Sequence, residues 1–157
     1  MLQARREEAA KAGISPQLIE DVLRRFMRES YSNENQFGFK TLNPAINKIV
    51  IVGGYGKMGQ LFARYLRASG YPISILDRDD WDVAERILTN ADVVIVSVPI
   101  DHTLETIERL KPYLTENMIL ADLTSVKRAP LPKMLDVHKG AVVGLHPMFG
   151  PDRKSVV

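Results

Sequence analysis

The stretch KIVIVGGYGKMG, residues 48–59, decides the fold of this chain. Its apolar run at 49–52 is followed by a glycine-rich turn and then by a helical spacing of apolar side chains. A second apolar run, 73–76, ends in Asp77. This order predicts a strand, a turn, a helix and a second strand in one parallel βαβ unit. The helix is expected to bury Leu61, Phe62, Tyr65 and Leu66 and to end at Gly70.

The turn carries a G-x-G-x-x-G pattern at Gly54, Gly56 and Gly59. In such a pattern one glycine makes the tight turn, one lets a pyrophosphate approach the backbone and one allows close helix–strand packing, and we assign these roles in that order. Asp77 follows Gly54 by 23 residues, near the spacing at which a carboxylate accepts hydrogen bonds from the adenosine ribose. A purely structural glycine turn is the alternative, but the strand–helix–strand context favours a dinucleotide site.

The rest of the chain continues the alternation of strands and helices. We expect a short helix after Asp79 and Asp80, with Trp81, Ala84, Ile87 and Leu88 facing inward. The later predictions are strands at 93–98, 118–121 and 141–145 and helices at 103–110 and 131–137, the first of these helices burying Leu104, Ile107 and Leu110. This order predicts an α/β fold, a doubly wound parallel sheet.

The N-terminal part has a different character. The composition of residues 1–12 predicts one helix, and Ser15 with Pro16 marks the start of a second. The second helix has an apolar stripe, which we expect to pack against the nucleotide-binding domain or a second chain. The stripe consists of Leu18, Ile19, Val22, Leu23, Phe26 and Met27. We therefore predict a helical segment at 1–31, a linker at 32–47 and a nucleotide-binding domain at 48–157.

Composition narrows the function classes. A net charge of +2, from 21 basic and 19 acidic residues, gives no case for nucleic acid. The chain has no cysteine, which excludes disulfides and thiolate metal sites, and its carboxylates lack metal-ligand spacing. No apolar run is long enough for a membrane span and the N-terminus is unlike a signal peptide, so we expect a cytoplasmic protein.

Polar residues follow the predicted strands, at the edge where ligands bind in such sheets. His146 could take a proton from an alcohol, or it could be a structural histidine on a rigid turn. Ser125 could be a site residue or the N-cap of the helix after it. Lys127 could serve an anionic substrate or be merely solvated. His102 and His138 are expected to be surface residues.

Four motifs occur in the order typical of prephenate dehydrogenase: the glycine turn, Ser97-Val98-Pro99, Asp122-Leu123-Thr124-Ser125-Val126-Lys127, and Gly144-Leu145-His146-Pro147-Met148-Phe149-Gly150-Pro151. Residues 48–152 resemble that family, and residues 1–35 look like the end of a chorismate mutase domain. Together they resemble the bifunctional chorismate mutase/prephenate dehydrogenase family of tyrosine biosynthesis. The resemblance implies that His146 hydrogen-bonds the ring hydroxyl of prephenate and takes its proton. It also implies that Ser125 aligns His146 with the nicotinamide and that Lys127 lies at the active site.

The expected cofactor is NAD, bound in a Rossmann-type domain. Its candidate contacts are Gly54, Gly56, Lys57, Met58, Gly59, Asp77, Arg78, Ser97, Val98 and Pro99. Asp77 would repel the 2′-phosphate of NADP, whereas Arg78 could swing toward that phosphate.

The departures from the family pattern shape the remaining expectations. The mutase-like part lacks the long first helix and the start of the second, and only Ser30 and Glu34 match mutase site positions, so mutase activity is not expected. The pattern ends after Asp152, without the helical domain that makes the homodimer and supplies an arginine to prephenate in the family. We therefore expect a segment that cannot complete its substrate site alone. A non-catalytic NAD-binding or interaction module and an arogenate dehydrogenase remain the alternatives.

Overall fold

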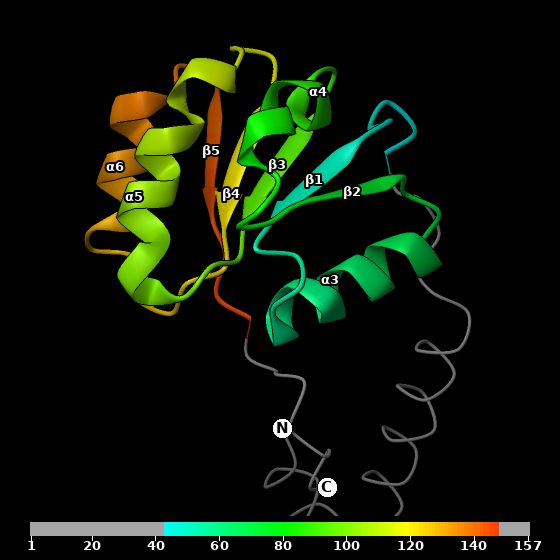
Figure 1. Cartoon of the computed structure of the whole chain (residues 1–157), viewed down its shortest axis with the longest axis horizontal. Helices are drawn as coiled ribbons and strands as arrows, with labels where there is room; N and C mark the ends of the chain where they lie inside the picture. Colours follow the sequence, from blue (N-terminus) through cyan, green and yellow to red (C-terminus); the bar gives the residue numbers. More distant parts are fainter. Residues whose placement is uncertain (1–42, 148–157) are drawn as a thin grey trace, which may run out of the picture. The chain divides into compact units, whose positions relative to one another are not determined.

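The computed structural model describes residues 43–147 of the chain. In this range strands and helices alternate (Figure 1). Their bounds are β1 Ile49–Val52, α3 Lys57–Ala68, β2 Ile73–Leu76, η1 Trp81–Val83, α4 Ala84–Leu88, β3 Val93–Val96, α5 Ile100–Leu110, η2 Lys111–Tyr113, β4 Ile119–Asp122, α6 Pro130–Val137 and β5 Ala141–Gly144. The helical segment at 1–31, its apolar stripe and most of the linker lie outside the described residues.

The strands form one five-stranded parallel sheet in the order β2-β1-β3-β4-β5. The chain passes from β1 to β2 on one side and then returns to place β3 on the other side of β1. This reversal makes the carboxyl ends of β1 and β3 a topological switch point, where open α/β sheets bind ligands. The predicted doubly wound sheet is confirmed.

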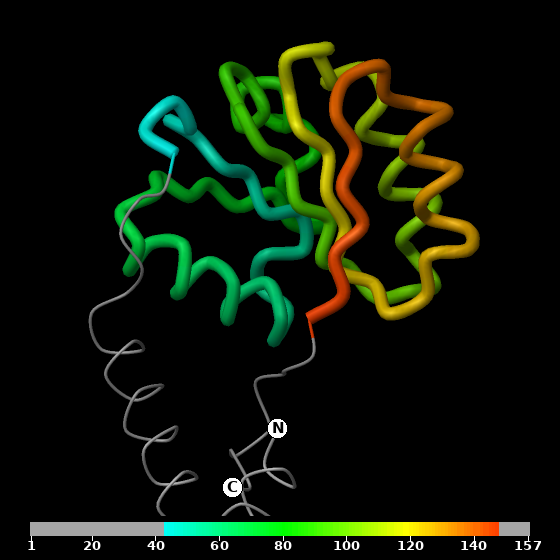
Figure 2. Tube along the Cα trace, turned by 180° about the vertical axis from the view of Figure 1, so that it is seen from behind, coloured from blue at the N-terminus to red at the C-terminus, as the bar shows by residue number. Residues whose placement is uncertain are grey.

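Helices cover both faces of the sheet (Figures 1 and 2). Helices α4, α5 and α6 cover one face through a core that includes Val94, Leu120 and Met134. Helix α3 lies on the opposite face, where Ala63 packs with Ile51 and other strand residues in a smaller core. Because β1 is apolar on both sides, its four residues are all buried, as expected of a central parallel strand.

Several predicted boundaries are shifted. The strand predicted at 93–98 ends at Val96, because its neighbour β1 ends at Val52 and the ladder stops there. The strands predicted at 118–121 and 141–145 are β4 and β5, displaced or shortened by one residue. Helix α5 begins at Ile100 rather than at Thr103, directly after Pro99.

The predicted inward face of α5 was wrong at Leu104. This side chain is 42% exposed, whereas Thr103 and Thr106 are buried beside Ile107 and Leu110. The hydroxyl of Thr103 donates to the carbonyl of Pro99 at 3.1 Å, which satisfies its polar group inside the core. A threonine can therefore replace the apolar residue that helical periodicity led us to expect.

His138 is a second correction, because it is buried rather than on the surface. It follows α6, and its Nε2 lies 2.8 Å from the carbonyl oxygen of Met118, just before β4. This bond satisfies the imidazole inside the fold, away from the carboxyl ends of the strands. His102, on α5, is exposed as predicted.

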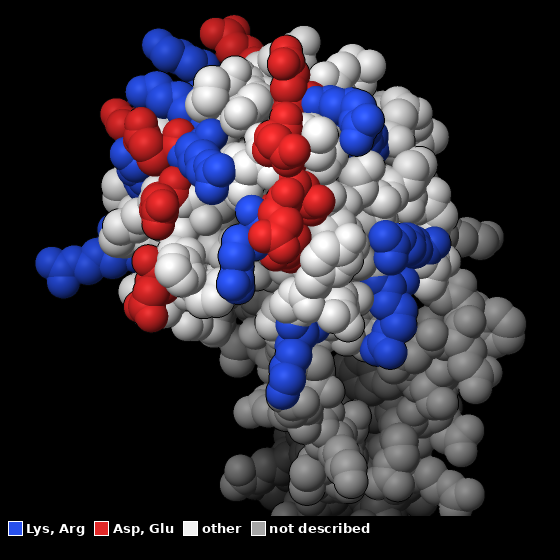
Figure 3. Space-filling view, in the orientation of Figure 1, with Lys and Arg blue, Asp and Glu red and all other residues white. Residues whose placement is uncertain are grey.

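The last predicted linker residues, 43–47, form a turn attached to the sheet. The backbone amides of Asn47 and Lys48 both donate to the carboxylate of Asp92, at 2.6 and 3.0 Å. Acidic and basic side chains are interspersed on the face shown in Figure 3. Within residues 43–147, no helix combines the length and apolarity that a bilayer crossing requires.

Candidate functional site

The last residues of the five strands lie in one row across the sheet. The parallel register pairs Leu76 with Val52, Val52 with Val96, Val96 with Asp122 and Asp122 with Gly144. Each candidate residue follows one of these strand ends. The structure therefore brings all the predicted site residues to the same edge of the sheet.

The tight turn after β1 belongs to Gly53 rather than to Gly54. Gly53 has φ +78°, and a Cβ there would lie 2.8 Å from the Ser97 carbonyl oxygen and 2.8 Å from Val98 Cγ1. Gly54 is required for a different reason, since its Cβ would lie 2.7 Å from Ile75 Cγ2 of β2. The glycine turn thus packs closely against the residues that follow β3 and against Ile75 of β2.

Gly59 has the packing role that the pattern predicts. A Cβ on Gly59 would lie 2.4 Å from the Gly53 carbonyl oxygen and 2.7 Å from Gly54 Cα, so helix and turn touch through their backbones. Gly56 is exposed, and a Cβ there would meet no atom closer than 3.3 Å. A ligand can approach the exposed backbone of Gly56, whereas the space beside Gly59 is filled by protein.

The N-terminus of α3 can receive an anion. Gly56 is its N-cap, no side chain caps it, and its first turn carries no acidic residue. Lys57 and Met58 are the first two residues of the helix, Lys57 exposed and Met58 half-buried. Uncapped N–H groups and the helix dipole favour phosphate at such a terminus.

Asp77 directly follows β2 and reaches the glycine turn. Its Oδ2 accepts the backbone N–H of Tyr55 at 2.9 Å, and its Oδ1 accepts that of Arg78 at 2.8 Å. Asp77 is half-buried and Arg78 is exposed. The carboxylate is therefore fixed at the side of the turn where a dinucleotide places its adenosine ribose.

Ser97 supplies a further sign of a polar ligand. Its Oγ is shielded from solvent and has no hydrogen-bond partner within the described part of the chain. A buried hydroxyl left without a partner is costly, so it is expected to bond a group that fills the space beside it. Val98 packs on the glycine turn, and Pro99 is the exposed N-cap of α5. Together with the exposed backbone of Gly56, these features fit a bound dinucleotide.

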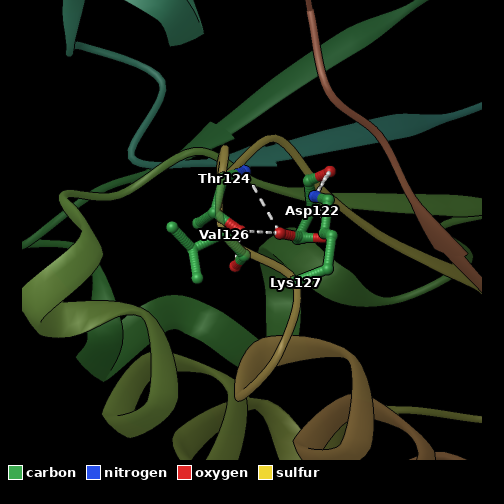
Figure 4. Close-up of polar contacts among 4 residues, drawn as sticks. All are labelled: Asp122, Thr124, Val126 and Lys127. Atoms are coloured by element: carbon green, nitrogen blue, oxygen red, sulfur yellow. Dashed lines mark hydrogen bonds and ion pairs between the residues drawn. The ribbon is translucent and has the colours of Figure 1, made fainter.

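The loop after β4 is held by charge. Lys127 Nζ lies 2.7 Å from Asp122 Oδ1 and donates to the Asp122 carbonyl at 3.3 Å (Figure 4). The Asp122 carboxylate also accepts hydrogen bonds from the backbone N–H and the hydroxyl of Thr124. Lys127 is therefore anchored rather than merely solvated.

Ser125 and His146 are exposed at the same edge. The N-cap of α6 is Ala129, so the alternative of Ser125 as the N-cap of this helix was wrong. His146 follows β5 by two residues, and the intervening Leu145 donates its N–H to the Asp122 carbonyl at 2.9 Å. Within residues 43–147 no hydrogen bond joins His146 to Ser125 or Lys127.

Sequence reasoning gave no role to Gly53, and it placed Asp122 and Thr124 in the motif after the fourth strand without assigning them a function. The sequence indicates a turn at the adjacent glycines Gly53 and Gly54. Which of the two adopts the positive φ depends on contacts with the neighbouring strands, which the sequence does not reveal. Asp122 had a signal as an acid at the end of an apolar run. Its partner Lys127, five residues on, could be assigned only from the shape of the loop.

The chain resembles known proteins over nearly its whole length. Residues 67–157 match the family model described as prephenate dehydrogenase, nucleotide-binding domain. Two curated relatives are both called T-protein. One, from Haemophilus influenzae, is 83% identical over 99% of this chain and 41% of its own length. The other, from Enterobacter agglomerans, is 56% identical over 99% of this chain and 42% of its own length. The chain thus spans about two fifths of these relatives.

A solved structure, the prephenate dehydrogenase from A. aeolicus in complex with hydroxyphenyl propionate and NAD+, has a similar fold. Its TM-score is 0.57 and its identity 25%, over 69% of this chain and 43% of the solved chain. The family model covers more than half of the chain, and the fold and the strand-end motifs agree with it. The chain therefore belongs to the family of the prephenate dehydrogenase nucleotide-binding domain.

Proposed function

We propose that this chain is the NAD-binding part of a prephenate dehydrogenase, which converts prephenate to 4-hydroxyphenylpyruvate by oxidative decarboxylation. One observation carries the proposal: the parallel register puts the glycine turn after β1 and His146 after β5 at the same edge of one sheet. A dinucleotide at the switch point would thus share this edge with a general base. The relatives called T-protein and the A. aeolicus enzyme support the same assignment.

Some of the described residues would bind the cofactor and others would act on the substrate. The N-terminus of α3 and the exposed backbone of Gly56 would receive the pyrophosphate, and Asp77 the ribose. Bound NAD would supply the acceptor for the hydride that leaves the ring carbon bearing the hydroxyl of prephenate. His146 would accept the hydroxyl proton, and the ring carboxylate would leave as carbon dioxide, which makes the ring aromatic. The chain itself contributes orientation and one proton acceptor.

NAD is proposed rather than NADP because the Asp77 carboxylate would repel a 2′-phosphate. Its fixed position supports this choice, since both of its oxygens already accept backbone N–H groups. Titration of the chain with both cofactors tests this assignment. Binding of NADP that is equal to or tighter than binding of NAD would contradict it.

The activity test requires a protein extended to the length of the relatives, since this chain spans 41% of the Haemophilus influenzae protein. We expect NADH to form when prephenate and NAD are supplied together. Binding of NAD without turnover would favour a non-catalytic nucleotide-binding or interaction module. Faster turnover with arogenate than with prephenate would change the substrate but keep the reaction class.

The resemblance also leads us to propose a homodimer for the full-length protein and a cytoplasmic location. Sedimentation of the extended protein tests the first proposal, and fractionation of cells that express it tests the second. A monomer at micromolar concentration would contradict the proposed homodimer. Recovery in the membrane or secreted fraction would contradict the cytoplasmic location.

A further inference from the structure

Asp122 stands where the neighbouring strands carry apolar side chains. The row of strand ends reads Leu76, Val52, Val96, Asp122 and Gly144, and the first three belong to the core under α4, α5 and α6. Asp122 is 0% exposed. A buried carboxylate is strongly unfavourable unless it is paired and hydrogen-bonded, so the acid needs compensation from its surroundings.

The loop after β4 provides that compensation (Figure 4). Oδ1 is paired with the ammonium of Lys127 at 2.7 Å. Oδ2 accepts the Thr124 backbone N–H at 3.1 Å and the Thr124 hydroxyl. One carboxylate therefore holds the loop between β4 and α6 on both sides of Ser125, at Thr124 and at Lys127.

The same residue connects this loop to β5. The aliphatic stem of Lys127 passes over Gly144, where a Cβ would lie 3.3 Å from Lys127 Cδ and 3.5 Å from Cε. The Asp122 carbonyl accepts both the Lys127 ammonium at 3.3 Å and the N–H of Leu145 at 2.9 Å. His146 is the next residue, so Asp122 links the loop of Ser125 to the strand end of His146.

The ammonium group of Lys127 keeps one donor for a ligand. It has three N–H groups, and two are directed at Oδ1 and the carbonyl oxygen of Asp122. The Lys127 side chain remains 26% exposed. Because Asp122 neutralises the charge, Lys127 offers an oriented hydrogen bond more than a net positive field.

We propose that Asp122 is a positioning residue, which holds Lys127 so that its remaining N–H donates to a carboxylate of the substrate. The inference rests on the proposed function, because it takes a dicarboxylate such as prephenate as the ligand. Asp122 acts only through Lys127, so the effects of substituting the two residues must be coupled. Independent residues would instead show additive effects.

Three variants separate this role from simple support of the fold. Asp122→Asn removes the charge and keeps the shape, and Lys127→Met removes the donor and keeps an apolar stem. The double variant removes both charges, a replacement that buried ion pairs commonly tolerate. It therefore keeps the proposal testable if Asp122→Asn alone fails to fold.

The first measurement needs no turnover and uses this chain. Acetylation of individual lysines by acetic anhydride is followed by mass spectrometry. We expect Lys127 to react several-fold faster in Asp122→Asn than in the parent, because loss of the ion pair leaves its amino group accessible to the reagent. Equal rates in the two proteins would overturn the anchoring of Lys127.

The second measurement uses the protein extended to the length of its relatives. We expect Asp122→Asn to raise KM for prephenate about tenfold, the scale of one hydrogen bond to a charged group, with kcat little changed. The double variant should have the same KM as Lys127→Met. An unchanged or lower KM in Asp122→Asn, or additive effects, would overturn the proposal. Absence of turnover in the parent would count against the proposed function, while the acetylation result would still decide the anchoring.

The pair formed by Glu108 and Lys133 supplies a matched control. It is also a carboxylate–lysine ion pair, but it joins α5 to α6 on the exposed surface. Glu108→Gln makes the same chemical change as Asp122→Asn. It should alter neither Lys127 acetylation nor KM, and a change in either would show that the effects at Asp122 are not specific.

Discussion

The glycine turn after β1 and the loop after β4 share one edge of the sheet but are stabilised in different ways. The turn is held by backbone packing, because added Cβ atoms at Gly53 or Gly59 would overlap neighbouring backbone atoms. The loop is held by side chains, through the ion pair between Lys127 and Asp122. The conformation of the turn therefore depends on steric packing of the backbone, and that of the loop depends on an ion pair between side chains.

This difference indicates how each half of the site can change. Close backbone contacts cannot relax without moving a strand or a helix, so a wrong residue in the turn costs both stability and cofactor binding. A buried ion pair can be removed by replacing both of its side chains while the strands stay in place. We therefore expect variants in the two regions to separate fold from chemistry.

The largest effect on turnover is expected from substitution of His146, which lies beside the loop after β4. In the extended protein, His146→Asn should lower kcat by about 10²–10⁴-fold, the usual contribution of a general base, and leave NAD affinity nearly unchanged. Steady-state kinetics and NAD titration measure the two quantities. Near-normal turnover together with a lower melting temperature would show that His146 only braces the strand end.

Gly59→Ala tests the role of backbone packing in the glycine turn after β1. Its Cβ would lie 2.4 Å from the Gly53 carbonyl oxygen, so we expect a stability loss of about 1–3 kcal/mol, as for overpacked cores, and weaker NAD binding. Denaturant unfolding and cofactor titration of this chain measure both. Gly56→Ala is the control, since its Cβ would lie 3.3 Å from the Gly53 carbonyl oxygen, a tight contact that a small shift relieves, so it should weaken NAD binding with a smaller stability loss than Gly59→Ala. Equal stability losses in the two variants would contradict the assigned roles.

Asp77→Asn addresses the point where the turn depends on a side chain. The amide retains one oxygen for the Tyr55 N–H but loses the charge, so we expect about tenfold weaker NAD binding and a smaller preference over NADP. Calorimetric titration with both cofactors measures the change. An unchanged ratio of the two affinities would show that the Asp77 charge does not select the cofactor.

The smallest effect is expected from the exposed pair, Glu108 and Lys133. Lys133 lowers the pKa of Glu108 from 4.5, and Glu108 raises the pKa of Lys133 from 10.5. The depressed pKa of Glu108 stabilises the fold above about pH 4.5, and this contribution is lost as pH falls through the folded-state pKa. The raised pKa of Lys133 stabilises below about pH 10.5 and is lost as pH rises through its folded-state value.

Glu108→Gln should therefore reduce stability slightly at neutral pH and not at all in strong acid. Thermal unfolding at several pH values measures the difference from the parent. A difference that stays constant from neutral to acidic pH would show that the ion pair is not its cause.

Much of the fold could be predicted from local pattern. The five strands, the glycine turn and the helices were expected in the observed order, because apolar periodicity and turn residues act within a few positions of the chain. The common edge of Asp77, Ser97, Lys127 and His146 followed from the rule that parallel strands end at one side of a sheet.

Local pattern failed where distant segments decide the outcome. Leu104 matches helical periodicity as well as Thr103 does, and only the position of α5 on the sheet exposes the leucine. His138 has no sequence signal of burial, because its partner Met118 lies 20 residues away along the chain.

The sequence by itself determined the alternation of elements, the glycine turn and the edge at which polar residues gather, because these depend on short-range backbone preferences and on strand direction. The tertiary structure alone decided that Gly53 takes the positive φ and that Asp122 holds Lys127 across Gly144. Both results depend on the approach of separate strands to within van der Waals distance. Such contacts are set by the packing of the whole sheet and its helices, which no short stretch of sequence contains.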